Sequence, residues 1–421
     1  MKLPKLTFWR AAAILIALAG LVVTFVRFTK GIGAVTNLND TYPWGLWIGF
    51  DVLCGVGLAA GGFTVTAIVY LFNLKKFHEI ARPAVLTAFL GYILVAVALM
   101  YDLGKPWNIW HPIIYWNERS VMFEVGWCVM LYLTVLALEF SPVLWEKLGW
   151  RRPQAIIKSL QIPLVIAGVV LSTLHQSSLG SLVLIAPERL HPLWWTPRLP
   201  LLFYISAIGI GFAMVIFESR LSSRAFGREL EMPILSQLGK GIVIPFMLFL
   251  VLRFEDLYAR GVLQAYAFQP TLEARMFWAE ILLGFVLPVL LLLSPTVRTS
   301  KRWLPFAATI AVLGFMFNRL NVSITAIQAR TPEFRYFPSL GEFVVSALLV
   351  VAGFTAFAIA VKYFNVFPPA VEKDERIVVG AGMPAWWEPE PRAASAAGAG
   401  SYTQCEGLPP AGSDGPRGMP R

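Results

Sequence analysis

The chain has 421 residues, of which 57% are hydrophobic and only 14% charged, whereas soluble proteins carry about 25% charged residues. The positive net charge of +10 could by itself indicate a nucleic-acid-binding protein. Here, however, the positive residues lie in short loops between apolar stretches, a pattern that follows from membrane topology. Composition and charge therefore exclude a soluble protein and predict no nucleic-acid partner.

Ten apolar stretches each approach the roughly 20 residues that a spanning helix needs. They are too long for barrel strands, so the sequence predicts an all-α, polytopic transmembrane helical bundle in contact with membrane lipid. The first stretch follows Lys2, Lys5 and Arg10 without an evident small-residue cleavage site, so we expect a retained signal-anchor helix. The predicted spans are residues 8–28, 44–73, 83–101, 120–140, 159–182, 199–218, 237–257, 274–294, 303–323 and 341–363.

Lys and Arg are distributed unequally between the two sides of these spans. The side that holds both termini carries 20 of them and the other side carries 12. The positive-inside rule then predicts a multi-pass protein of the bacterial inner membrane with both termini cytoplasmic. We expect residues 1–368 to form the transmembrane domain. Residues 369–421, rich in Ala, Gly, Pro and Ser, are expected to be a disordered cytoplasmic tail.

Two local patterns have simple structural interpretations. Residues 55–61 imitate a dinucleotide-binding fingerprint, but no strand precedes them, so we expect Gly57 and Gly61 to permit close helix packing. The aromatic loops 106–112 and 191–195 are expected to be interfacial caps, and docking of a partner on this surface is an equally open alternative.

The histidines and cysteines address the question of bound cofactors. Of the four histidines, only His175 lies clearly within a predicted span, so no intramembrane histidine pair is available for a b-type haem. The three cysteines do not form a group that could ligate an iron–sulfur cluster. The sequence therefore predicts no haem, no iron–sulfur cluster and no metal site, and any electrons must come from a partner.

Ionisable residues inside spans are costly and usually functional. Helical rise places most of them in the half of the membrane opposite the termini, which suggests a shared polar site there. Glu139 and Glu146 are expected at the interface, and Asp102 and Glu255 can be explained as helix caps or ion pairs. The candidates in that half are Asp51, Asp102, Glu124, His175, Arg253, Glu255, Asp256, Glu280 and Arg319, while Tyr92 and Glu218 continue towards the cytoplasm.

Such a site suits quinone chemistry. Quinone reduction needs hydrogen-bond donors at two carbonyl oxygens and two protons for every two electrons, which histidine and carboxylic acids can provide. A proton-coupled transporter would use similar residues, so that alternative stays open here.

Seven stretches of the chain form a recognisable series: YPWGLWIGFD (42–51), YDLGKPWN (101–108), VMFE (121–124), LHQSSLGSL (174–182), HPLW (191–194), VIFE (215–218) and LRFE (252–255). In their order and spacing they resemble the NrfD-like polysulfide-reductase membrane-subunit family, and most closely its HybB-type members. The resemblance covers nearly all of residues 8–368. Lys105 stands where relatives often have Arg.

The resemblance implies two four-helix bundles with two further helices. It also implies a haem-free subunit that exchanges electrons between a membrane quinone, such as menaquinone, and a periplasmic ferredoxin-like iron–sulfur subunit. In the HybB type the other partners are the small and large subunits of a Ni/Fe hydrogenase.

The resemblance also assigns roles to residues at matching positions. Tyr92, Glu124, His175 and Glu218 are implied to be quinone-proximal or to carry protons. With Glu124 and His175, we expect Asp51, Asp102 and Arg253 to shape the quinone pocket. A molybdopterin reductase or a multihaem cytochrome remains an alternative partner.

Overall fold

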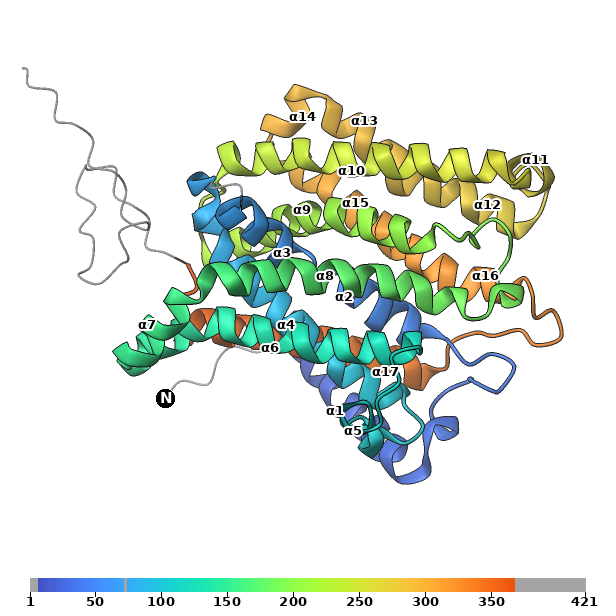
Figure 1. The fold of residues 1–421 in the computed structure, drawn as a ribbon, viewed down its shortest axis with the longest axis horizontal. Coiled ribbons are helices and arrows are strands. Elements are labelled where there is room, and N and C mark those ends of the chain that lie inside the picture. Colours follow the sequence, from blue (N-terminus) through green and yellow to red (C-terminus); the bar gives the residue numbers. More distant parts are fainter. Residues whose placement is uncertain (1–6, 72–73, 368–421) are drawn as a thin grey trace, which may run out of the picture. The chain divides into compact units, whose positions relative to one another are not determined.

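The structure is a computed structural model that describes residues 7–71 and 74–367. In this part of the chain ten helical runs are long and apolar enough to cross a membrane, and there is no strand, so the predicted all-α membrane bundle is confirmed (Figure 1). The expected tail at 369–421 lies outside the described residues. The spans are α1 (Phe8–Lys30), the run η2–η3 (Trp47–Tyr70), α4 (His78–Asp102), α6 (Val121–Leu148), α8 (Gln161–Leu184), α9 (Leu199–Phe226), α10 (Met232–Ala259), α12–α13 (Leu272–Leu293), α15–α16 (Trp303–Gln328) and α17 (Leu340–Tyr363).

The spans form the predicted two four-helix bundles with two further helices. The run η2–η3 packs with α4, α6 and α8 in the first bundle, and α9, α10, α12–α13 and α15–α16 form the second. Helix α8 lies between α6 and α9 (Figure 1), so the bundles share the α8–α9 contact. The two further helices are α1 and α17, which pack on each other, and α17 also packs on α4.

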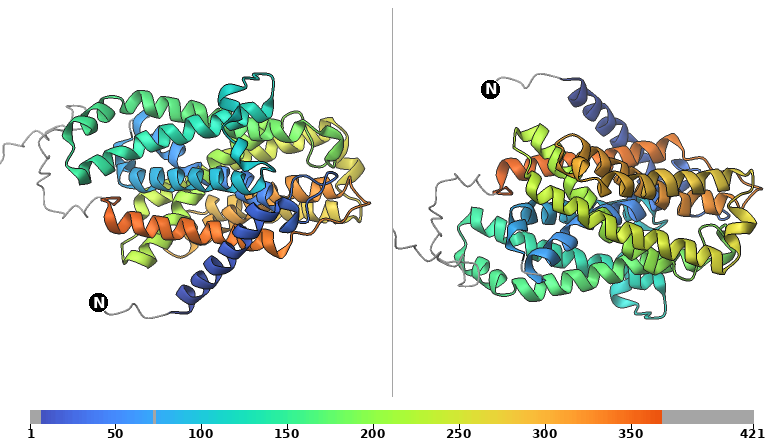
Figure 2. Two further views of the ribbon diagram at one scale, coloured as in Figure 1. Left: turned by 90° about the horizontal axis from the view of Figure 1, so that it is seen from below. Right: turned by 90° about the horizontal axis from the view of Figure 1, so that it is seen from above.

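The two ends of the bundle are used below as reference points. We call the end where α1 begins and α17 ends the terminal face, and the opposite end the loop face (Figure 2). Figure 2 also shows that the first turns of α1 diverge from the other spans. The side chain of Trp9 is accordingly 79% exposed. The short helices between spans are η1 (Ile32–Ala34), η4 (Lys75–Phe77), η5 (Pro106–Asn108), α5 (His111–Ile114), α7 (Arg151–Ser159), η6 (Pro187–Arg189), α11 (Val262–Tyr266) and α14 (Pro295–Thr299).

Several helices extend beyond their apolar segments at the terminal face. Helix α6 continues to Leu148 and α9 to Phe226, about two turns past the predicted ends. Both stop where a glycine adopts a left-handed conformation, Gly149 with φ 71° and Gly227 with φ 68°. Hydropathy could not place these ends, because the additional turns carry polar and charged residues.

Four stretches within the spans have wide π-helical turns, which often occur at functional sites. Three of them contain buried polar residues: η2 (Trp47–Cys54) holds Asp51, η7 (Glu280–Val286) begins at Glu280, and η8 (Asn321–Thr325) begins at Asn321. The fourth is η3 (Ala67–Leu71).

Close packing at Gly57 is confirmed. A Cβ atom added there would lie 2.2 Å from Cζ of Phe315 on α15, so only glycine permits this approach.

The two aromatic loops behave differently. Trp107 and Trp110, near η5 and α5 at the loop face, are exposed as expected for a cap. The same expectation is wrong for loop 191–195, where Leu193 and Trp194 are fully buried. Polar contacts with the second bundle, described below, draw this loop inward.

Candidate functional site

Tyr92 and His175 form a direct contact in the first bundle. The Tyr92 hydroxyl on α4 lies 2.9 Å from Nδ1 of His175 on α8, and neither side chain is exposed. Each residue is about 15 Å along its helix from the loop face. Among the described residues, Nε2 of His175 has no hydrogen-bond partner. The ring is therefore held at one nitrogen and remains available at the other.

Glu124 and Glu218 are near this pair but do not hydrogen-bond to it. Glu124 lies in the first turn of α6 and is exposed. It precedes Cys128 by one helical turn, and Cys128 lies beside Ser178 of α8. Glu218 is half-buried on α9, next to Thr87 on α4. Glu124 thus lies on the loop-face side of Tyr92 and His175, and Glu218 lies on their terminal-face side.

Asp51 and Asp102 belong to a different cluster, at the loop face between η2, α4, α1 and α17. Asp51 Oδ2 accepts a 2.6 Å hydrogen bond from Ser346 on α17. Asp102 lies near Arg27, which is buried and donates hydrogen bonds to the carbonyl oxygens of Tyr101 and Leu103 at 2.7 and 2.6 Å. This cluster fastens α1 and α17 to the first bundle.

A loop tyrosine extends the same cluster. The Tyr336 hydroxyl donates to Glu342, whose other oxygen completes a capping box with Ser339 at the start of α17. Burial first, and then the adjacent Glu342 carboxylate, raise the pKa of Tyr336 well above its usual value. Tyr336 therefore stays neutral and acts as a permanent donor.

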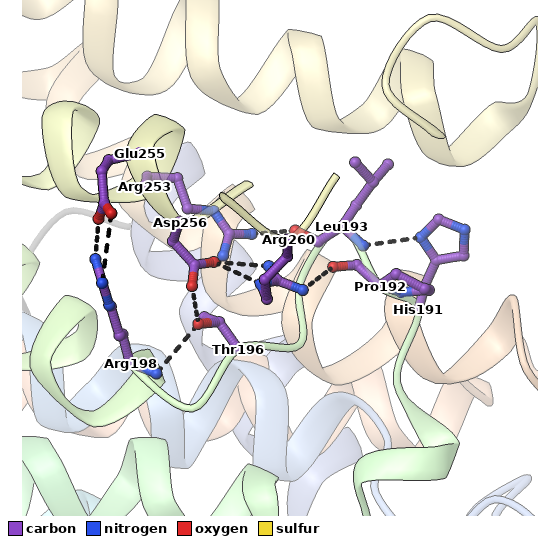
Figure 3. A network of polar contacts seen from close by, with 9 residues as sticks. All are labelled: His191, Pro192, Leu193, Thr196, Arg198, Arg253, Glu255, Asp256 and Arg260. Atoms are coloured by element: carbon purple, nitrogen blue, oxygen red, sulfur yellow. Dashed lines mark hydrogen bonds and ion pairs between the residues drawn. The ribbon is translucent and has the colours of Figure 1, made fainter. Parts of the chain in front are cut away.

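Arg253 belongs to the second bundle, together with the buried loop 191–195 (Figure 3). Its guanidinium donates to the carbonyl oxygen of Leu193, while its Nε and Nη1 have no partner in the described part of the chain. Next to it, Asp256 accepts from Thr196 at 2.8 Å and from Arg260 at 2.7 Å. These contacts explain why the loop lies in the core.

Glu280 is the most strongly coordinated buried carboxylate of this bundle. It accepts hydrogen bonds from Trp194 at 2.9 Å, Asn318 at 2.6 Å and Asn321 at 2.8 Å, and it is completely buried. Arg319 continues the network through Asn318 and lies 3.6 Å from the centre of the Phe203 ring. The sequence-based candidates therefore separate into three clusters: one around Tyr92 and His175, one around Asp51 and Asp102, and one around Arg253 and Glu280.

The comparison with known proteins agrees with this architecture. The family model described as polysulphide reductase, NrfD, matches residues 34–330. The chain belongs to the NrfD family. A protein of Nitratidesulfovibrio vulgaris is 42% identical over 83% of this chain and 93% of its own length.

Two further relatives of this NrfD-family protein have names that describe complexes. The probable Ni/Fe-hydrogenase 2 b-type cytochrome subunit of Escherichia coli is 35% identical over 83% of this chain and 89% of its own length. The menaquinone reductase integral membrane subunit of N. vulgaris is 27% identical over 89% of this chain and 95% of its own length. The family consists of membrane subunits of quinone-linked oxidoreductases, and this chain is a multi-pass member of it.

The name of the E. coli relative raises the question of a haem in this NrfD-family protein. His175 is the one histidine within a candidate span, because His78 stands at the start of α4, two residues before the apolar span begins at Ile80. A haem held between two histidines of the bundle therefore does not fit these residues. Among the described residues, no group of three or more His, Cys, Asp or Glu side chains is arranged to hold a metal ion.

Several residues of these clusters carry no clear functional signal in the sequence. Trp194, Asn318 and Asn321 surround Glu280, but tryptophan and asparagine do not stand out in an aromatic loop or near a helix end. Tyr132 is a further such residue, although its ring centre lies 4.6 Å from that of Tyr92. A search for polar residues repeated every four positions would have found Glu124, Cys128 and Tyr132 on one face of α6.

Proposed function

We propose that this protein passes electrons between a periplasmic iron–sulfur partner and the membrane quinone pool, with coupled proton uptake. The proposed partner is a ferredoxin-like subunit that receives electrons from the small and large subunits of a Ni/Fe hydrogenase. The name of the E. coli relative supports the hydrogenase, and that of the N. vulgaris relative supports menaquinone. This chain has three cysteines, fewer than a cluster with four cysteine ligands needs.

The contact between Tyr92 and His175 is the observation that carries the proposal. When the Tyr92 hydroxyl donates to Nδ1 of His175, the neutral ring carries its proton on Nε2. That N–H is a donor for a quinone carbonyl oxygen in an apolar surrounding, where hydrogen bonds are strong. The apolar tail of the quinone would enter from the lipid, between helices.

The reduction needs two electrons and two protons for each quinone. As Nε2 of His175 gives its proton to the reduced oxygen, Nδ1 can take the proton of the Tyr92 hydroxyl. Tyr92 then recovers a proton from groups nearer the terminal face. We propose Glu218 as a contributor to this supply and Glu124 as a group near the loop-face side of the quinone. Asp51, Asp102 and Arg253 would set the charge around the pocket.

We further propose that the protein lies in the bacterial inner membrane, with the terminal face in the cytoplasm. The excess of Lys and Arg in the loops of that face supports this orientation. Protons taken from the cytoplasm, together with hydrogen oxidised at the periplasmic side, would conserve energy.

The same quinone chemistry could serve a different periplasmic oxidoreductase. A relative from Mesobacillus selenatarsenatis, named as one of the subunits of a selenate reductase, is 27% identical over 84% of this chain. That name favours a reductase as the second candidate partner.

Purification of the complex from its native membrane tests both candidates. Mass spectrometry of the co-purifying chains should find hydrogenase subunits and a ferredoxin-like subunit, and the complex should reduce a menaquinone analogue with hydrogen. A molybdopterin reductase in their place would select the second candidate. Full quinone reduction by a His175→Ala variant would contradict the proposed site.

A further inference from the structure

Unpaired polar atoms are concentrated between α4, α6 and α8. Nine buried side-chain nitrogen or oxygen atoms have no hydrogen-bond partner within the described residues, and six of them belong to these three helices. Buried polar groups are nearly always paired with protein or with ordered water. The contact between these helices is therefore suited to internal water. One of the six is Asp102, which belongs to the loop-face cluster, and the other five residues are Thr87, Tyr132, Glu139, Ser172 and His175.

The α6 side of this region is a continuous polar face. Glu124, Cys128 and Tyr132 are spaced four residues apart, and Glu139 follows two turns later on the same face. Ser172 of α8 lies beside Tyr132. Glu139 itself faces Gly168 of α8, where an added Cβ would lie 3.6 Å from its Oε1. This oxygen is buried and points into the contact between α6 and α8.

Tyr132 connects this face to the proposed quinone site. Its ring meets that of Tyr92 edge-on, and Tyr92 is bonded to His175. The side chains of Tyr132 and Ser172 are 1% and 0% exposed. The Tyr132 ring is therefore next to the residue that must be reprotonated after His175 has acted.

Glu139 connects the same face to the terminal end of the bundle. It lies near Tyr70, which in turn is close to Arg82. Arg82 is partly exposed and pairs at 3.8 Å with Glu146, about 10 Å further along α6. Polar groups thus continue from the half-exposed pair at the terminal face to the buried oxygen of Glu139.

We propose that the polar face of α6 is a proton path, with Glu139 as its proton-exchanging carboxylate. The inference rests on the proposed quinone reduction and adds residues that supply its protons. Glu139 takes a proton from the terminal face and releases it through water to the Tyr132 hydroxyl. Tyr132 passes a proton through water to Tyr92, so that Glu139, Tyr132 and Tyr92 return to their starting protonation states. His175 is left with its proton on Nδ1 and returns to its starting state by tautomer exchange. Two such transfers supply the two protons that one quinone consumes with two electrons.

The test compares variants of Glu139 in the purified complex. Glu139→Gln keeps the shape but cannot exchange a proton, so kcat for quinone reduction should fall at least tenfold with KM unchanged. Glu139→Asp should recover most of the rate and shift its pH profile. Tyr132→Phe, which removes one hydroxyl group, should also lower kcat. Reduction of a soluble dye by the partner subunits should stay unchanged in every variant.

Glu229→Gln is the matched control, because this glutamate is exposed at the terminal face between α9 and α10 and does not belong to the polar path. Full kcat for both Glu139→Gln and Tyr132→Phe would overturn the proton path. Equal losses in the Gln and Asp variants of Glu139 would indicate a structural role and overturn it as well. If His175→Ala still loses activity in either case, the proposed quinone site survives. If His175→Ala is also fully active, the proposed function fails with it.

Discussion

The indole nitrogen of Trp194 donates a 2.9 Å hydrogen bond to Oε2 of Glu280. This contact joins a connecting loop to the wide turn at the centre of the eighth span. Two asparagine amides complete the coordination of the carboxylate. The second bundle is therefore organised around a buried acid that is at the same time a structural anchor.

Replacing Glu280 by alanine should strongly destabilise the protein. The change leaves three buried N–H donors without their acceptor and Arg253 without its nearby charge. We expect the free energy of unfolding to fall by about 3–5 kcal/mol. Thermal unfolding of the detergent-solubilised protein measures the effect. The control is Glu255→Ala, whose exposed ion pair with Arg198 contributes at most about 1 kcal/mol. Similar shifts of the unfolding temperature in both variants would contradict the role of Glu280 as a structural anchor.

Tyr92→Phe should lower quinone reduction by about ten- to a hundredfold. The variant keeps the ring but removes the hydroxyl that fixes the tautomer of His175. Steady-state assays with a menaquinone analogue and with a soluble dye separate this effect from damage to the partner. Tyr258→Phe, at a side chain that is 69% exposed, is the control. An unchanged rate with quinone would remove Tyr92 from the mechanism.

Stability should decrease as the pH falls through about 6.5, in part because of His191. Burial lowers the pKa of His191; the nearby Glu273 opposes this effect and Arg330 adds to it. The unfolded chain then binds the proton more readily than the folded one, so stability is retained above the ordinary pKa and lost below it. Thermal midpoints between pH 5 and 8 should fall less steeply for His191→Gln. Identical slopes of thermal midpoint against pH for the original protein and the His191→Gln variant would exclude a contribution of His191.

The purified protein should contain no stoichiometric b-type haem. The reason is that His175 is the one histidine within a candidate span, so no second histidine of the bundle is available as the other axial ligand. A reduced-minus-oxidised absorption spectrum checks this, with a haem-containing membrane cytochrome as the positive control. One haem for each chain would contradict the assignment and would require ligands other than paired histidines.

Reporter fusions test the proposed orientation. A periplasm-specific reporter should be active when inserted after Arg189 and inactive when inserted after Arg152. The reason is that Arg152 lies in a loop of the terminal face, where positive residues are frequent. The reverse pattern would mean that the terminal face lies in the periplasm. The proposed proton supply would then come from the periplasm and not from the cytoplasm.

The fold was largely predictable because spanning helices are local. A run of about 20 apolar residues has to become a helix in lipid, whatever its neighbours are. Ten spans and the close approach at Gly57 followed from this rule. The helix ends at Leu148 and Phe226 did not, because the additional turns lie outside the apolar segment and are no longer governed by hydropathy.

The sequence by itself determined which residues were worth attention, because a charge in a span is costly wherever it points. Only the tertiary structure decided their partners, since these depend on helix rotation, and one residue turns a helix by about 100°. It paired Tyr92 with His175, assigned Asp51 to the contact with α17, and turned Oε1 of Glu139 inward. It also buried Trp194 in a loop that hydropathy places at the surface, because the donors and acceptors it meets come from distant segments.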